Sequence, residues 1–258
     1  MQLAKIPRKY GLKRDKRHFD HPRHVFAVDR APLPTSVDLR DKMPPIYDQG
    51  QLGSCSANAF AAAFEYDQMN NRSASHAKPF MPSRLFIYYN ERSLEGTINS
   101  DDGAALEDGV IALKNKGVCP ETIWPYDIRQ FAKCPPKAAY GAAYHNKLMS
   151  FKEIQQSATQ IKTALAQGYP IVFGIMIYES FESDAVAATG MVPMPRANER
   201  CMGGHAIVLV NYDDSKKMFG FRNSWGSSWG ASGCGYLPYE YVLNPNLASS
   251  FWVLLKVQ

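Results

Sequence analysis

Cys55 is the residue of this 258-residue chain whose type and position best suit covalent chemistry. It stands at the expected first turn of an alanine-rich helix, and Gly50 and Gly53 precede it. The unpaired amide groups and the dipole at a helix start favour a thiolate over a thiol. A small buried cysteine is the alternative, but a glycine-flanked loop tends to expose what it presents. We therefore predict that Cys55 is a nucleophile.

A thiolate nucleophile needs a base that later protonates the leaving amine, and histidine does this near neutral pH. His205 opens a β-branched run, and Asn223 ends the next expected strand. Antiparallel pairing would return Asn223 to the start of the His205 strand, where its side chain can orient the imidazole. Taken singly, a core histidine and a plain turn remain the alternatives. Together with Cys55, the two residues predict acyl transfer through a covalent intermediate.

Two kinds of local pattern divide the chain into a helical and a β part. Apolar residues at helical spacing predict helices over 54–70, 83–95, 104–116 and 158–167. Runs of β-branched and aromatic residues predict strands over 170–178, 205–212, 217–224 and 251–257. This order predicts the α+β class, with a helical lobe over about 45–145 and an antiparallel β lobe over about 146–258.

The basic charge of the chain belongs to its N-terminal arm. Residues 1–30 carry nine Lys and Arg against three acids, whereas the rest carries 20 basic and 21 acidic groups, which together give the net charge of +5. The composition, 45% hydrophobic and 21% charged, is typical of a globular protein and excludes a disordered chain. No apolar run approaches the ~18 residues of a membrane helix, so no membrane partner is expected.

Three ordered motifs resemble those of papain-family cysteine peptidases. They are the segment 49–55 (QGQLGSC), the tripeptide 204–206 (GHA) and the block 223–230 (NSWGSSWG). The resemblance covers about residues 33–258, and the segment 55–59 (CSANA) looks like the bacterial branch of the family. It implies a papain-like fold with a helical left lobe, an antiparallel, barrel-like right lobe and a cleft between them. It also implies a cysteine endopeptidase that forms a thioester acyl-enzyme on peptide or protein substrates.

The family pattern implies further roles for matching positions. Gln49 would donate its side-chain amide to the oxyanion, and Trp225 would shield the hydrogen bond between His205 and Asn223. The backbone of Gly103 would pair with an extended substrate. A roomy main specificity pocket, suited to a bulky apolar residue, would be lined by Ala104, Ala105, Gly174 and Ala206. The resemblance implies neither a metal nor an organic cofactor.

The cysteines depart from the usual family pattern. Leu52 and Ser100 occupy the positions of a common cysteine pair. Cys119 and Cys134 flank the Trp-Pro-Tyr element and could bridge each other. Five cysteines leave at least one unpaired within the monomer, and free buried thiols are the alternative for Cys201 and Cys234.

Residues 1–31 precede the part that resembles a mature family domain, which would comprise 32–258. They resemble the short leader of the bacterial branch, and our hypothesis is a zymogen whose leader covers the cleft and partly blocks the active site. One alternative is a tether for an anionic surface or for nucleic acid, the latter of which we do not favour. The other alternative is a disordered tail. A metal site at His18, His21 and His24 would lack Cys or carboxylate partners. For the whole chain, the rivals are an acyltransferase or amidase with the same triad, and a silent binding protein that uses its basic arm.

Overall fold

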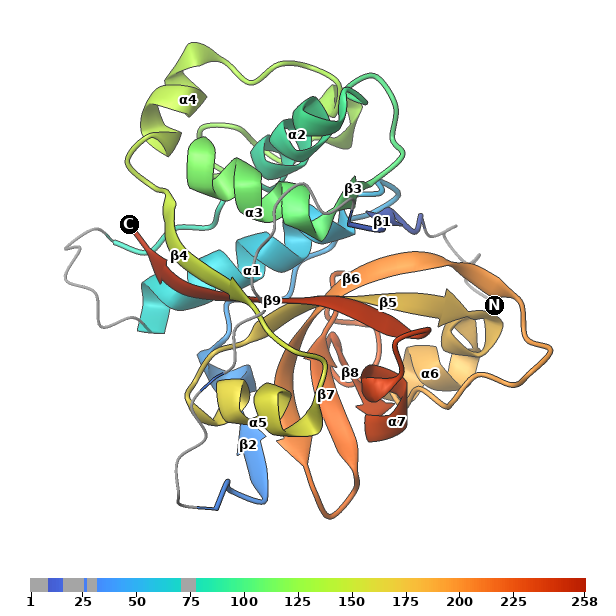
Figure 1. The fold of residues 1–258 in the computed structure, drawn as a ribbon. Coiled ribbons are helices and arrows are strands. Elements are labelled where there is room, and N and C mark those ends of the chain that lie inside the picture. The colour runs from blue at the N-terminus through green and yellow to red at the C-terminus, as the bar shows by residue number, and fades with distance from the viewer. Residues whose placement is uncertain (1–8, 16–25, 27–31, 71–77) are drawn as a thin grey trace.

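The computed structural model describes residues 9–15, 26, 32–70 and 78–258. Four helices gather on one side of the long strands (Figure 1). They are α1 (Cys55–Asn70), α2 (Arg84–Glu95), α3 (Leu106–Asn115) and α4 (Lys137–Ala143). The strand part carries α5 (Ala158–Ala166), α6 (Asp184–Thr189) and α7 (Tyr239–Leu243). Short 3₁₀ turns form at Arg40–Lys42, Ile128–Gln130 and Glu179–Glu182.

The long strands form one antiparallel sheet in the order β4-β9-β5-β6-β7-β8. Their bounds are β4 (Leu148–Glu153), β5 (Ile171–Tyr178), β6 (Cys201–Asp213), β7 (Met218–Arg222), β8 (Cys234–Pro238) and β9 (Ala248–Val257). A short strand, β2 (Ser36–Asp38), pairs with the end of β6. The outermost strands β4 and β8 are not neighbours in this order, so the lobe expected to be barrel-like is an open sheet and not a closed barrel.

Helix α1 lies between the helical part and the sheet (Figure 1). Twelve of its 16 residues are buried, which requires cover on nearly all sides. It contacts α2 and α3 on one side and β6 and β9 on the other. The many alanines leave room for these close approaches. As a result, Cys55, the first residue of α1, lies at the boundary between the two parts.

The predicted helix over 104–116 begins two residues late, at Leu106. Ala104 and Ala105 instead form the short strand β3, which pairs in parallel with β1 (Leu12–Lys13) of the N-terminal arm. Backbone pairing with a distant segment therefore overrides local helix propensity here. The other predicted helices and strands form within four residues of their expected bounds.

All five cysteines lie within the described residues, and each is a free thiol. The bridge between Cys119 and Cys134 that the sequence allowed is not formed. Cys119 is completely buried in the core, whereas Cys134 is exposed in the loop before α4. Within the described part of the chain, every helix is too short or too polar to cross a membrane.

Candidate active site

The sulfur of Cys55 lies where the first turn of α1 meets β6. Cys55 is completely buried. Backbone hydrogen bonds reach its sulfur from Ala206, which follows His205 in β6, from Gly11 of the N-terminal arm and from Ser56. Because His205 directly precedes Ala206 in β6, the backbone of His205 lies close to the thiol. Two segments 150 residues apart in the sequence thus meet at this sulfur.

His205, the residue before Ala206, forms a buried pair with Asn223. The imidazole Nε2 lies 2.8 Å from Oδ1 of Asn223, and because an amide oxygen can only accept, Nε2 carries the hydrogen. The same Oδ1 also accepts from the backbone amide of Ser224 at 2.9 Å. The ring of Trp225 stacks on His205 with 4.9 Å between centroids and excludes water from the pair.

Gln49 is completely buried and is held from both parts of the chain. Its Oε1 accepts from the hydroxyl of Ser224 at 2.6 Å, and its Nε2 donates to the carbonyl of Leu52 at 3.0 Å. These two bonds fix which end of the amide is the donor. One Nε2 hydrogen remains available to a ligand in the cleft.

Burial raises the pKa of the Cys55 thiol to about 11, and the charge of Glu91 acts in the same direction. The sequence led us to expect an ionised sulfur at this helix start. In the present arrangement, the removal of water from the sulfur outweighs the helix start. Glu91 is itself completely buried and accepts from Ser56 Oγ at 2.8 Å, and burial raises its pKa to about 8.

The N-terminal arm covers the sulfur with its segment 9–15, which we call the leader strap. The carbonyl of Gly11 accepts from the amide of Ala104 at 2.8 Å. A Cβ atom on Gly11 would overlap the backbone of Gly53, and one on Gly103 would overlap the backbone of Gly11. The strap can therefore lie this close only because glycine stands at these positions.

On either side of Gly11, the strap contacts both parts of the chain. The ring of Tyr10 lies edge-on to His205 and Trp225, with 6.4 Å between centroids in each case. The hydroxyl of Tyr10 donates to Glu182. Leu12 packs its side chain against Gly174, where a Cβ atom would overlap it. The strap thus occupies the space directly over the His205 ring and along the sheet.

Charged groups of the strap meet carboxylates and helix amides along the cleft. Lys9 pairs with Asp101 at 2.6 Å, and Lys13 pairs with Glu95. Asp15 accepts from the backbone amide of Glu107 at 3.0 Å, in the first turn of α3. Burial raises the pKa of Asp15, even though the side chains of Ser250 and Trp252 also hydrogen-bond its carboxylate.

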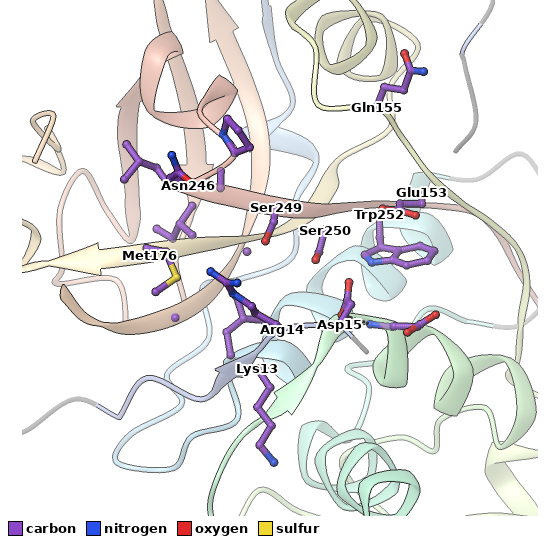
Figure 2. Close-up of a pocket in the computed structure, with 18 residues that line it drawn as sticks. Lys13, Arg14, Asp15, Glu153, Gln155, Met176, Asn246, Ser249, Ser250 and Trp252 are labelled. Carbon is purple, nitrogen blue, oxygen red and sulfur yellow. Dashed lines mark hydrogen bonds between the residues drawn. The ribbon is translucent and has the colours of Figure 1, made fainter. Parts of the chain in front are cut away.

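A cavity of about 820 Å³ lies beside the strap, between it and strands β5 and β9. Figure 2 shows Met176, Ser249 and Ser250 on the strand side, with Arg14 and Asp15 of the strap facing them. Gly174, one of the residues predicted for the specificity pocket, lines this cavity. Of the other residues predicted for that pocket, Ala104 and Ala105 pair with the strap, and the backbone of Ala206 contacts Cys55.

Several residues of the site carried no role in the sequence reasoning. Ser224 lies within the NSWG block and orients Gln49. The carboxylates of Glu95, Asp101 and Glu182 face the strap, and no local pattern distinguishes them from surface acids. The basic charge of the arm is a sequence feature that fits these acidic partners. The histidines at 18, 21 and 24 lie outside the described residues.

Comparisons with known proteins agree with this geometry. The family model described as papain family cysteine protease matches residues 33–244. A protein of Acanthamoeba polyphaga mimivirus, described as an uncharacterized peptidase C1-like protein, is 43% identical over 218 residues, which are 81% of this chain and 69% of that protein.

Solved structures give the same result. Xylellain, a cysteine protease from Xylella fastidiosa, is 38% identical with a TM-score of 0.86, covering 96% of each chain. Digestive procathepsin L 3 of Tenebrio molitor larval midgut has a TM-score of 0.71 at 20% identity, over 92% of this chain and 75% of that one, and supports the fold alone. The predicted two-lobed papain fold and the likeness to the bacterial branch are thereby confirmed. The chain is a peptide hydrolase and belongs to the papain family of cysteine proteases.

Proposed function

We propose that this peptidase is an endopeptidase that works through a thioester acyl-enzyme on Cys55 and is held latent by residues 1–31. In this proposal, residues 32–258 form the peptidase domain, with a helical lobe over about 45–145 and a β lobe over about 146–258. The observation that carries the chemistry is the buried pair of His205 and Asn223, with the backbone of the adjacent Ala206 on the sulfur of Cys55.

The proposed reaction starts when the leader departs and His205 accepts the thiol proton of Cys55. The thiolate attacks a peptide carbonyl, and the oxyanion is stabilised by Gln49 Nε2 and the amide of Cys55. His205 then gives its proton to the departing amine, which leaves the acyl group on the sulfur as a thioester. Water, deprotonated by His205, hydrolyses this thioester and restores the thiol. Asn223 and Trp225 hold the imidazole in place throughout.

The proposed latency rests on the contacts of the strap. Gly11 lies on the sulfur, and Tyr10 covers the ring of His205, so a substrate carbonyl has no access to either group. The thiol is also held in its neutral form by burial, which removes the nucleophile at neutral pH. Cleavage or displacement of the strap would remove both obstacles at once.

Active-site titration tests the chemistry. A chain that lacks residues 1–31 is expected to react with one equivalent of a thiol-directed epoxide, with complete loss of peptidase activity. Peptide mapping by mass spectrometry should find the label on Cys55. The Cys55→Ala variant should stay unlabelled under the same conditions, because activation by His205 is proposed for Cys55 alone. Inactivation through the exposed Cys134 or Cys201, with Cys55 unmodified, would contradict the proposal.

A further inference from the structure

The carboxylate of Glu95 is built into the wall of the cleft. Its side chain is only 4% exposed although it ends helix α2. Oε1 accepts from the backbone amide of Ala105 at 3.0 Å, and Oε2 accepts from Thr97 Oγ1 at 3.3 Å. Among the described residues, the cation that pairs with this carboxylate is Lys13 of the leader strap. The counter-ion of this buried acid therefore belongs to the leader strap, which has to leave the cleft in the proposed activation.

Alternation along the strap directs Lys13 to this acid. Leu12 turns its side chain toward Gly174 on the β part, and the next residue, Lys13, turns to the opposite side (Figure 2). Successive side chains of any extended segment alternate in this way, whichever direction the segment runs. If Gly11, which lies at the sulfur, is counted as the first residue, Lys13 is the third, and it faces Glu95.

We propose that Glu95 forms a cation-binding subsite, filled by Lys13 in the latent chain and by a lysine or arginine side chain of the substrate after the leader has left. The subsite accepts the third residue from the scissile bond, next to the residue that takes the place of Leu12. This inference rests on the proposed endopeptidase function and adds a substrate class to it: extended peptides with a basic residue at that position.

The physical reason is the charge that Lys13 leaves behind. When Lys13 leaves, Glu95 keeps the two neutral donors that hold its carboxylate at the cleft wall, but it loses its counter-ion. A substrate ammonium or guanidinium group restores the balance with a charge-assisted hydrogen bond. A neutral side chain cannot do so, so the subsite discriminates on charge.

Asp101, the other acid that a strap lysine contacts on the helical part, is a weaker candidate. Besides Lys9, it accepts from the amide of Gly53 at 3.0 Å and from the hydroxyl of Tyr88 at 2.6 Å. The guanidinium of Arg92, which lies over the Tyr88 ring, also interacts with its charge. Asp101 therefore keeps a cation nearby when the strap departs, whereas the ion pair of Glu95 in the described part of the chain is lost with the strap.

The test uses the full chain with Gly11→Ala, which prevents the strap from seating, and two peptides that differ only in lysine or norleucine at the third position. We expect kcat/KM for the lysine peptide to exceed that for the norleucine peptide by at least about tenfold. Adding Glu95→Gln, which retains the oxygen that accepts from Ala105, should bring this ratio to within about twofold. Adding Glu182→Gln, a cleft carboxylate on the other side of Cys55, should leave the ratio in place.

A ratio near one with Glu95 intact, or a ratio that survives Glu95→Gln, would overturn the subsite. If neither peptide is cleaved, the proposed endopeptidase function fails for these sequences, and binding decides the subsite separately. Calorimetry on the full chain with Gly11→Ala and Cys55→Ala should then show tighter binding of the lysine peptide by about tenfold. Equal or undetectable binding of the two peptides would also overturn it.

Discussion

Replacing Gly11 by alanine is expected to accelerate the alkylation of Cys55 about 10²-fold at neutral pH. The added Cβ atom would overlap the backbone of Gly53, so the leader strap can no longer lie on the sulfur. Exposure then lowers the thiol pKa from about 11 toward or below its usual value near 8.5, and each unit raises the thiolate fraction about tenfold. The measurement is the rate of iodoacetamide incorporation at Cys55, read by mass spectrometry, together with peptide turnover.

The same change should alter the pH dependence of the reaction. Because the thiol pKa is higher with the strap in place, loss of the proton favours the open form. Latency should therefore be complete below the pKa that the Cys55 thiol has without the strap. It should decline as the pH rises from there toward about 11, the pKa of the thiol under the strap. Alkylation of the unchanged chain should rise steeply in that range, whereas the Gly11→Ala chain should already have levelled off.

A matched control separates this effect from a general cost of alanine. Gly141 lies in α4 with open space where a Cβ atom would stand, so Gly141→Ala should leave both rates unchanged. A chain that lacks residues 1–31 should behave like Gly11→Ala. Turnover that is unchanged after both the substitution and the deletion would rule out the leader as the cause of latency.

Replacing Gln49 by alanine is expected to lower kcat by about 10²–10³-fold, the usual effect of removing one oxyanion donor. The Gly11→Ala background is needed so that the cleft is open. Gln49 does not hydrogen-bond the sulfur, so the alkylation rate of Cys55 should change by less than about threefold. The split between turnover and alkylation is the signature of a group that acts on the oxyanion and not on the thiolate.

Ser224→Ala provides the graded comparison for Gln49. This variant loses the hydroxyl that orients Oε1 but keeps the donor itself, so its fall in kcat should be smaller. A parallel loss of turnover and alkylation in Gln49→Ala would mean that the buried amide supports the structure around Cys55, and the oxyanion role would be wrong. Circular dichroism melting of each variant shows whether the fold is retained.

The sequence predicted best those helices, strands and site residues whose positions depend on a local pattern or on the pairing of neighbouring strands. The helix that starts at Cys55, the strand of His205 and the return of Asn223 to that strand follow from periodicity and antiparallel geometry. Gln49, six residues before Cys55, was located through the family motif. In the structure, His205 and Asn223 hydrogen-bond each other, and the residues next to them, Ala206 and Ser224, contact Cys55 and Gln49. Their positions were predictable because each belongs to a short segment with a strong local signal.

What failed depends on contacts between distant segments. The ionisation of Cys55 was judged from its helix start, whereas burial under Gly11 and beside Ala206 sets its pKa. Helix α3 starts late because β3 pairs with the arm. In each case, the deciding partner is remote in sequence.

The cap of α3 shows that the leader also contributes to the fold. Ala105 precedes this helix and has no side chain that can accept from the first amides. The carboxylate of Asp15 accepts from the amide of Glu107 instead, from a different segment of the chain. Removal of the leader therefore takes this partner away from the Glu107 amide, directly after β3, the strand that pairs with the strap. Removal of the leader would loosen the first turn of α3 next to Ala105. A peptide that binds in the cleft would then have to order this turn again.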